Sequence, residues 1–341
     1  MRIAVDAMGG DRAPCEVVKG TIDAAKVYPR DEFILVGDET AIKLELGAAG
    51  ARKRNLRIIH APEMVGMEES PVKALRSKQG TSIAVAIETI AKGEADAVVS
   101  AGHTGATVAA ACLGLKRLKG CVRPGIAVCL PTLEDRFIVI CDAGANIAAK
   151  PIHLFQYGVM ARVFAANVLE VEDPSIGLLN VGTEEGKGTD LVKEAYNLLK
   201  DSSLNFIGNM EGRDIATGAA DICVCEGFVG NIILKLSEGL AMSLMKTIGE
   251  ECTKGPWTQL GLALSKPALR SIKDRIDFSE YGGAPLLGID GVIIVSHGSS
   301  NAKAITSAIR ESLKFVSSDV NRKIEAELAK HARHPATHAA E

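Results

Sequence analysis

Short runs of apolar, often β-branched residues alternate along this chain with longer segments in which apolar residues recur at helical spacing. Most of the short runs are apolar at every position, which is typical of strands that helices cover on both faces. The predicted strands are Arg2–Val5, Phe33–Val36, Leu56–Ile59, Ala97–Ser100, Ile126–Leu130, Phe137–Cys141, Ile176–Asn180, Asn205–Ile207, Ile222–Cys225 and Val292–Val295. This alternation predicts an α/β fold with a largely parallel sheet between two layers of helices.

A long amphipathic helix is predicted over residues 231–250. Its apolar stripe consists of Ile232, Ile233, Leu236, Leu240, Leu244 and Ile248, a spacing that places these side chains on one helical face. No internal repeat divides the chain, so we expect residues 1–320 to form a single large α/β domain. Residues 321–341 are expected to begin as a charged helix and to end as a disordered tail.

Residues 252–277 interrupt the alternation because they contain no predicted strand. Pro267 breaks their helical pattern, which predicts a protruding hairpin of two short helices that meet at residues 265–267. The side chains expected at or beside its tip are Trp257, Leu260, Leu262, Leu264, Lys266, Leu269 and Arg270. Two interpretations remain open: the hairpin packs on the core or on a second subunit, or it lies on an anionic membrane surface.

Composition narrows the classes of protein. The chain has 341 residues, 47% of them hydrophobic and 24% charged, with a formal net charge of −3. A pI of about 6.2 argues against nucleic acid as a partner, because phosphate backbones attract basic surfaces. The first ten residues lack the apolar core of a signal peptide. One of the longest charge-free runs, residues 104–115, is shorter than the roughly 20 residues of a spanning helix, so we expect no transmembrane segment.

The cysteines point to no metal centre. None of the eight cysteines stands at C-x-x-C spacing from another, and most lie inside apolar runs. Buried, reduced thiols are therefore the expected state. A zinc site needs paired ligands at short spacing, and no such pair is visible, so we expect no metal.

Glycines cluster directly after predicted strands, where each strand leads into a helix. Six such loops contain residues 6–11, 101–105, 142–146, 181–188, 226–231 and 296–301. Backbone N–H groups at these positions bind anions, and the carboxyl ends of parallel strands meet at one edge of a sheet. The sequence therefore predicts an anion site at that edge.

The residues in these loops narrow the choice of anion. The spacing from Gly182 to Gly188 does not fit a Walker loop, because Gly188 stands where Ser or Thr would hold magnesium. No Gly-x-Gly-x-x-Gly follows the first strand, and no cluster of carboxylates resembles a metal cage. N–H donors with one candidate cation, Lys187, favour inorganic phosphate or a phosphate ester, without a cofactor.

Several segments together resemble a known family. They are MRIAVDAMGGD at the start, SAGHTGA at 100–106, DAGAN at 142–146, NVGTEEGKG at 180–188, GFVGN at 227–231, and DFSEYGGAPLLGIDG…HGSSN at 277–301. In this order, from Met1 to about Val320, they are similar to the PlsX family of bacterial phosphate acyltransferases. One departure is that Ala148 stands where members commonly carry Asp, which leaves Asp142 as the acid of that loop.

The resemblance implies a reaction and a setting. A fatty acyl group would move from acyl carrier protein to inorganic phosphate, and the acyl phosphate would supply a membrane-bound glycerol-3-phosphate acyltransferase. It also implies a homodimer with a Rossmann-like three-layer fold, located in the cytoplasm and bound peripherally to the inner face of the cell membrane. A lipid-like anionic product favours the membrane interpretation of the hairpin.

Phosphate is itself a nucleophile and a thiolate is a good leaving group, so the protein is expected to position phosphate and to stabilise an oxyanion. The candidate catalytic residues are Lys187, Asn231, His103 and Asp142. The candidate phosphate- or substrate-binding residues are Gly9, Gly10, Asp11, Gly102, Thr104, Asn146, Gly182, Thr183, Gly230, His297, Ser299 and Asn301.

Each candidate side chain also has a plain structural interpretation. Lys187 could be a solvated loop lysine, and Asn231 could cap the helix that it precedes. His103 could be an ordinary loop histidine, and Asp142 could orient backbone amides without touching substrate. His297, with Ser299 and Asn301, could form a turn.

Two other functions remain to be compared. An oxidoreductase of the isocitrate dehydrogenase type would need a nucleotide site and a metal-binding aspartate cluster, neither of which the sequence shows. A non-catalytic adaptor could dock carrier protein at the membrane through basic residues such as those at 52–54 and 116–123. An adaptor, however, gives no reason for six anion-binding loops.

Overall fold

The computed structural model describes residues 1–341 except 51–53, 67, 79, 135, 277–281 and 332–341. Its strands are β1 (Arg2–Asp6), β2 (Glu32–Gly37), β3 (Leu56–His60), β4 (Ala97–Ser100), β5 (Gly125–Pro131), β6 (Phe137–Cys141), β7 (Ile176–Leu179), β8 (Phe206–Met210), β9 (Ile222–Val224), β10 (Ala284–Leu287) and β11 (Val292–Val295). They form one sheet in the order β3-β2-β1-β4-β11-β10-β5-β6-β9-β7-β8. All ten predicted strands are present, and β10 is the addition.

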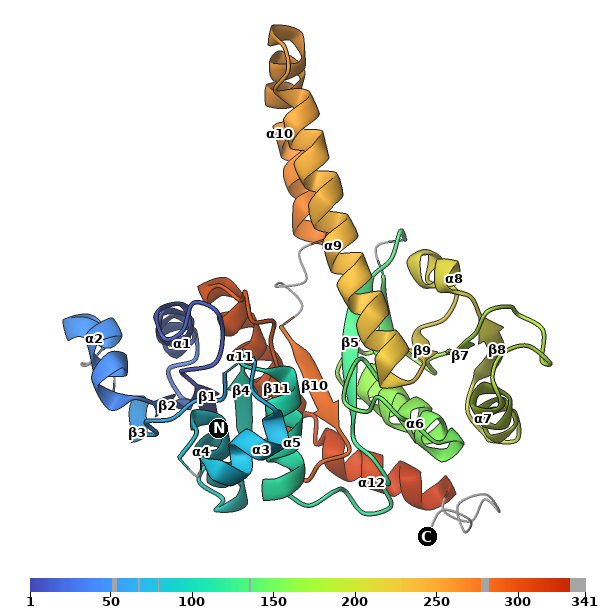
Figure 1. Cartoon of the computed structure of the whole chain (residues 1–341), viewed down its shortest axis with the longest axis horizontal. Coiled ribbons are helices and arrows are strands. Elements are labelled where there is room, and N and C mark those ends of the chain that lie inside the picture. The colour runs from blue at the N-terminus through green and yellow to red at the C-terminus, as the bar shows by residue number, and fades with distance from the viewer. Residues whose placement is uncertain (51–53, 67, 79, 135, 277–281, 332–341) are drawn as a thin grey trace.

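The sheet consists of two parallel blocks that run in opposite directions. Strands β3, β2, β1, β4 and β11 are mutually parallel, and so are β6, β9, β7 and β8. Antiparallel pairing of β10 with β11 and β5, and of β5 with β6, reverses the direction between the blocks. In Figure 1 the blocks lie on either side of β10.

The register of the central strands brings the carboxyl ends of both blocks to one level. Val295 ends β11 and pairs with Ala284 at the start of β10. On β5, Ile126 pairs with Leu286 of β10, and the next residue, Ala127, pairs with Cys141 at the end of β6. The two strand ends therefore lie within about one residue of each other along β10, three strand spacings or about 14 Å apart.

Helices cover both faces of the sheet, which confirms the three-layer α/β prediction. The helices are α1 (Cys15–Val27), α2 (Glu39–Gly50), α3 (Pro71–Ser77), α4 (Ser82–Ala91), α5 (Thr104–Gly114), α6 (Pro151–Asn167), α7 (Asp190–Lys200), α8 (Gly212–Thr217), α9 (Gly227–Cys252), α10 (Pro256–Ile276), α11 (Ala302–Ser317) and α12 (Val320–His331). Alternate residues of β1 point to different cores: Ile3 and Val5 pack with α1 and α11, whereas Ala4 packs with α4 and α5. This alternation is what a strand covered on both faces requires.

A helical hairpin projects away from the sheet, but it is built differently from the predicted one (Figure 1). Its two arms are the long helices α9 and α10, and the turn between them lies at residues 253–255. Pro267 sits inside α10 instead of ending a helix. The prediction of a tip at residues 265–267 is therefore wrong. The reason is that a proline costs a helix about 3 kcal/mol, which a long helix packed against a neighbour tolerates.

The new position of the turn changes what the hairpin presents. Trp257 is 83% exposed near the turn, and Leu260 and Leu264 are exposed on the same arm. Leu262 and Leu269 are partly buried. Lys266, Leu269 and Arg270 lie along the arm and not at its tip.

Among the described helices, α9 alone is long and apolar enough to cross a membrane, and 6% of its most apolar window is buried. This helix does not form a charge-free run in the sequence, because its most apolar stretch contains up to two charged residues. Length and composition by themselves do not assign it to a membrane.

The C-terminal segment begins as a helix, as expected from the sequence. Residues 320–331 form α12, which packs on α6, and Ile324 and Leu328 are buried. The backbone N–H of Lys119 donates to Glu325 Oε1 at 2.8 Å, and Arg162 pairs with Glu327 at 3.3 Å. These contacts show that the charged helix expected at the start of this segment has one apolar face, which packs on the domain. Residues 332–341 lie outside the described part of the chain.

Candidate functional site

Three loops of the first block converge at the glycines after β1. A Cβ on Gly9 would lie 2.7 Å from the backbone N of Gly102, so only glycine allows these two loops to touch. Gly10 has a φ of +118° and lies against Gly298, whose carbonyl accepts the backbone N–H of Asp11 at 2.8 Å. We call the loops after β1, β4 and β11 (residues 6–11, 100–104 and 296–301) the first loop group.

The candidate side chains of the β4 loop lie at the start of α5. His103 is the N-cap residue, yet its side chain forms no capping bond. Its Nδ1 is buried without a hydrogen-bond partner among the described residues. Thr104 is exposed in the first turn of α5, next to Gly102 and the free N–H groups at the helix start. This geometry leaves His103 available for chemistry.

In the loop after β11, several polar side chains form hydrogen bonds within the loop or to the start of the next helix. His297 Nδ1 lies 2.7 Å from Ser299 Oγ, and His297 Nε2 lies 3.5 Å from Glu238 Oε2 on α9. Asn301 Oδ1 accepts the backbone N–H of Ala304 at 2.9 Å and caps α11. These contacts favour a turn and a helix cap for Ser299 and Asn301.

The second block has its own convergent loops, centred on Asp142. This fully buried carboxylate accepts backbone N–H groups of Ile126, Gly144, Ala145 and Asn146 at 2.7–3.1 Å. Burial raises the pKa of Asp142, and the amide hydrogen bonds counter that effect. With its oxygens occupied by amides, Asp142 holds the loop in shape and has no lone pair directed at a substrate.

Asn146 and Asn231 occupy different positions in this second loop group, which comprises residues 142–146, 180–188 and 226–231. Asn146 Nδ2 donates to Pro124 O and to Tyr157 Oη, so its side chain belongs to the loop framework. Asn231 is exposed within α9 and lies against Gly144. It does not cap α9, because Glu226 fills that position and accepts the N–H of Phe228 at 3.0 Å. Gly230 leaves no room for a side chain beside the Asp142 carbonyl.

The loop after β7 carries the candidate cation. Lys187 is exposed, its stem lies over the buried Gly182, and no described carboxylate pairs with its ammonium group. Asn180 Nδ2 donates to the Lys187 carbonyl at 3.1 Å and steadies the loop, while Thr183 is exposed. Lys187 is therefore held by its backbone and free at its charged end.

The candidates thus form two groups and do not share a single edge of the sheet. The prediction of one edge assumed one strand direction, and the antiparallel strands β10 and β5 reverse it. The register nonetheless brings the two groups to one level, and the contact between His297 and Glu238 joins the first group to α9. Among the described candidate residues, His103 has a buried ring nitrogen without a partner, and Lys187 has an exposed ammonium group with no described carboxylate beside it.

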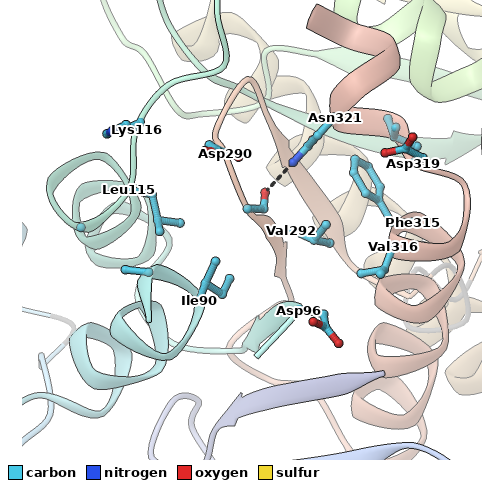
Figure 2. A pocket seen from close by; sticks show the side chains of 14 residues that line it. Ile90, Asp96, Leu115, Lys116, Asp290, Val292, Phe315, Val316, Asp319 and Asn321 are labelled. Carbon is cyan, nitrogen blue, oxygen red and sulfur yellow. Dashed lines mark hydrogen bonds between the residues drawn. The ribbon is translucent and has the colours of Figure 1, made fainter. Parts of the chain in front are cut away.

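A cleft of about 540 Å³ lies elsewhere, at the amino ends of β4 and β11 (Figure 2). Ile90, Leu115 and Val292 line it, and Asn321 Nδ2 donates to the Gly291 carbonyl at 3.2 Å. None of the predicted site residues lines it, and Asp96 at its rim is paired with Arg2 at 2.9 Å. Within the described residues, no group of three or more His, Cys, Asp or Glu could hold a metal ion.

Comparison with known proteins decides the family. A model described as "Fatty acid synthesis protein" matches residues 1–323. The chain is 50% identical over 329 residues to the phosphate acyltransferase of Desulfitobacterium hafniense, covering 96% of this chain and 98% of that protein. It is 49% identical over 310 residues to that of Pelotomaculum thermopropionicum, covering 91% and 90%. The chain belongs to the PlsX family of phosphate acyltransferases. Family membership identifies an acyltransferase in preference to the adaptor or the dehydrogenase.

The fold has solved counterparts. A phosphotransacetylase from Streptococcus pyogenes superimposes with a TM-score of 0.62 at 19% identity, covering 93% of this chain and 94% of that one. A likeness at this identity establishes the Rossmann-like fold, which agrees with the prediction.

Sequence reasoning missed several residues that shape the two loop groups. Asp6 and Ser100 are buried beneath the first loop group, Glu226 caps α9, and Glu238 contacts His297. The signal for Asp6 was present, because it stands directly after a strand and before two glycines, as Asp142 stands before Gly144. Residues 277–281, which open the last matching segment, and 52–53 of one basic cluster lie outside the described residues.

Proposed function

We propose that this chain transfers a fatty acyl group from acyl-acyl carrier protein to inorganic phosphate, and that the acyl phosphate feeds phospholipid synthesis. Family membership supports acyl transfer to phosphate. The fold, which is shared with a phosphotransacetylase, agrees with this proposal. The observation that carries the site is the register of the central strands. It brings the carboxyl ends of β11 and β6, which lead into the two loop groups, to one level about 14 Å apart.

The acyl group in this proposal passes directly to phosphate and not through one of the cysteines in the core. Burial raises the pKa of Cys121, Cys129 and Cys223 to about 12, so these thiols are poor nucleophiles. A phosphate oxygen attacks the thioester carbonyl, the C–S bond breaks, and the carrier thiolate leaves and takes up a proton. The protein's part is to position the two reactants and to stabilise the oxyanion.

Each loop group has a role in this proposal. Gly10 of the first group and Gly182 and Thr183 of the second supply N–H and hydroxyl donors to phosphate. Gly9, whose N–H donates to the Asp6 carbonyl at 3.4 Å, lets the loops approach closely enough to bind it. Lys187 neutralises its charge, because its ammonium group has no described partner. His103 and Asn231 polarise the thioester carbonyl or move a proton, since both side chains are free of capping bonds.

Lys187→Ala tests the assignment. Acyl-phosphate formation is followed by hydroxylamine trapping as phosphate is varied, and we expect the apparent KM for phosphate to rise about tenfold or more, as for loss of one charge-assisted contact. Lys193→Ala is the matched control, because Lys193 is an exposed lysine six residues away on α7. Equal phosphate affinity and turnover in the two variants would remove Lys187 from the site.

We also propose that the hairpin attaches the enzyme peripherally to the inner face of the membrane, where a glycerol-3-phosphate acyltransferase takes the product. Trp257, Leu260 and Leu264 are exposed near its outer end. Replacing Leu260 and Leu264 by Gln should abolish binding to anionic vesicles and leave activity on dissolved substrates intact. Leu44→Gln on α2 is the control, because Leu44 is 80% exposed and Leu264 76%. Vesicle binding by the double variant would exclude this end of the hairpin as the anchor.

The proposal includes a homodimer formed along α9. Leu236, Leu240 and Leu244 are each more than half exposed at successive turns of this helix. An apolar row of this length on a projecting helix is typical of a contact surface. Leu240→Glu should convert the dimer to a monomer in sedimentation velocity, whereas an unchanged sedimentation coefficient would place the dimer contact elsewhere.

A further inference from the structure

A buried carboxylate lies beneath the first loop group and has no part in the proposed reaction. Asp6 ends β1, and only 3% of it is exposed. Its Oδ2 accepts the hydroxyl of Ser100 at 2.7 Å, and its Oδ1 accepts the backbone N–H of Met8 at 3.3 Å. The hydroxyl of Ser82, from the start of α4, lies beside the carboxylate at the same small cavity and counters the rise in its pKa. The carboxylate therefore joins three segments of the chain.

Ser100 connects this carboxylate to the neighbouring glycine turn. Its Oγ donates to Asp6 and accepts the backbone N–H of Gly102 at 3.1 Å. A hydroxyl that donates to a carboxylate is fixed in orientation and is a stronger acceptor for the next donor. The direction of the Gly102 N–H thus depends on Asp6. His103, the next residue, moves with that turn.

Space around Gly9 ties the same carboxylate to the other glycine loop. A Cβ on Gly9 would lie 2.6 Å from Asp6 Oδ2 and 2.7 Å from the Gly102 nitrogen. The two loops and the carboxylate are therefore packed without room for a side chain. Asp6, Gly9, Gly102 and His103 also line one small cavity.

We propose that Asp6 is a positioning residue of the first loop group. Through Ser100, which accepts the Gly102 N–H, it holds the turn at Gly102 and His103 in the arrangement that binds phosphate. Asp6 does not touch the substrate. The inference rests on the proposed function, because it names what organises one half of that site.

The second loop group supplies an internal precedent. Asp142 directly follows the last residue of β6, is buried, and accepts amides from the glycine loop to which it belongs. Burial raises the pKa of both carboxyls, and hydrogen bonds from their neighbours counter this effect at each. The difference is that Asp142 holds its loop directly, whereas Asp6 reaches the second glycine turn through a hydroxyl.

Two serine variants separate positioning from plain stability. Ser100→Ala and Ser82→Ala each remove one hydroxyl from Asp6 at positions 1% and 2% exposed, but only Ser100 leads on to Gly102. We expect Ser100→Ala to raise the KM for phosphate about tenfold while the KM for the acyl thioester stays within about twofold. Ser82→Ala should lower the melting temperature to a similar extent and shift the phosphate KM less than about threefold.

Asp6→Asn is the third variant, with an expected rise in phosphate KM at least as large as that of Ser100→Ala. Unchanged phosphate KM in Ser100→Ala, or equal shifts in Ser100→Ala and Ser82→Ala, would overturn the inference. Equal shifts would mean that Asp6 acts only through stability. Absence of acyl-phosphate formation by the unaltered protein would instead refute the proposed function, so the two failures are distinguishable.

Discussion

The two loop groups place similar glycine loops at strand ends but organise them differently. In the second group Asp142 binds four backbone amides itself, within one short loop and the start of β5. In the first group Asp6 acts mainly through hydroxyls, and the loops touch one another at Gly9 and Gly102. The Asp142 loop is held by hydrogen bonds from its own amides to one carboxylate. The Gly102 turn is held through the Ser100 hydroxyl, so its position depends on β1 and β4 together. We therefore expect substitutions in the second group to lower the free energy of unfolding more, and substitutions in the first group to raise the KM for phosphate more.

The largest expected effect is that of removing Asp142. Asp142→Ala leaves four amides without their acceptor, and we expect a loss of about 4 kcal/mol in the free energy of unfolding. Asp6→Ala should cost about 2 kcal/mol, because hydroxyls can turn to other partners more easily than amides. Urea denaturation followed by circular dichroism measures both. A larger loss for Asp6→Ala would reverse the comparison.

Gly230→Ala comes next in size. Its Cβ would overlap the Asp142 carbonyl, so the start of α9 must shift, at an expected cost of about 3 kcal/mol. Gly239→Ala in the same helix has no neighbour within 4 Å and should stabilise by about 0.5–1 kcal/mol, the usual gain for Gly to Ala inside a helix. Thermal melts of the two variants give the comparison. Similar melting temperatures would mean that the contact between α9 and the Asp142 loop is loose.

Acid titration offers a smaller effect that both groups share. The pKa values of Asp6 and Asp142 are raised by burial, so the folded protein holds these protons more tightly than the unfolded chain does. Above the ordinary aspartate pKa of 3.8, rising pH ionises the unfolded chain first and lowers the free energy of unfolding until the folded pKa is passed. Asp6→Asn and Asp142→Asn cannot titrate there.

The stability deficit of each Asn variant relative to wild type should therefore shrink, by on the order of 1 kcal/mol, as pH rises through that window. Urea denaturation at a series of pH values from 4 upward, with salt held constant, measures it. A deficit that grows with pH would mean that the folded pKa is lowered.

The smallest expected effect concerns the link between the groups. Glu238 is partly exposed. Its Oε2 accepts a hydrogen bond from Lys235 Nζ at 2.9 Å and lies 3.5 Å from His297 Nε2. Glu238→Gln should cost about 0.5 kcal/mol, as surface ion pairs do. A loss above about 2 kcal/mol in urea denaturation would show that the groups are coupled far more strongly through α9 than this contact implies.

Much of the fold followed from the sequence because buried parallel strands are continuously apolar. Strand β10 was missed because four residues with a proline, APLL, carry little signal, although this strand reverses the sheet direction. The turn of the hairpin was misplaced because local rules end a helix at Pro267, whereas packing against α9 carries α10 through it. The packing of α12 on α6 was not predicted, because charged residues dominate the sequence of α12 and the surface that covers its apolar face lies far away in the chain.

The glycine loops were found from the sequence because strand, glycine and helix follow each other locally. Their division into two groups could not be found, because it depends on strand order and register across residues far apart in the chain. Asn231 was placed before its helix because the start of α9 is set by Glu226, a capping residue that local hydrophobic spacing does not reveal.

Helix α9 belongs to both ends of the molecule. Its inner end holds Gly230 and Asn231 against the Asp142 loop, and its 26 residues continue outward for about 39 Å at 1.5 Å per residue. A rod fixed at one end transmits a tilt at its free end to whatever sits at the pivot. If the outer arm is held as proposed, a tilt of that arm would therefore change how Asn231 lies against the Asp142 loop, and attachment and site geometry would be coupled through one helix.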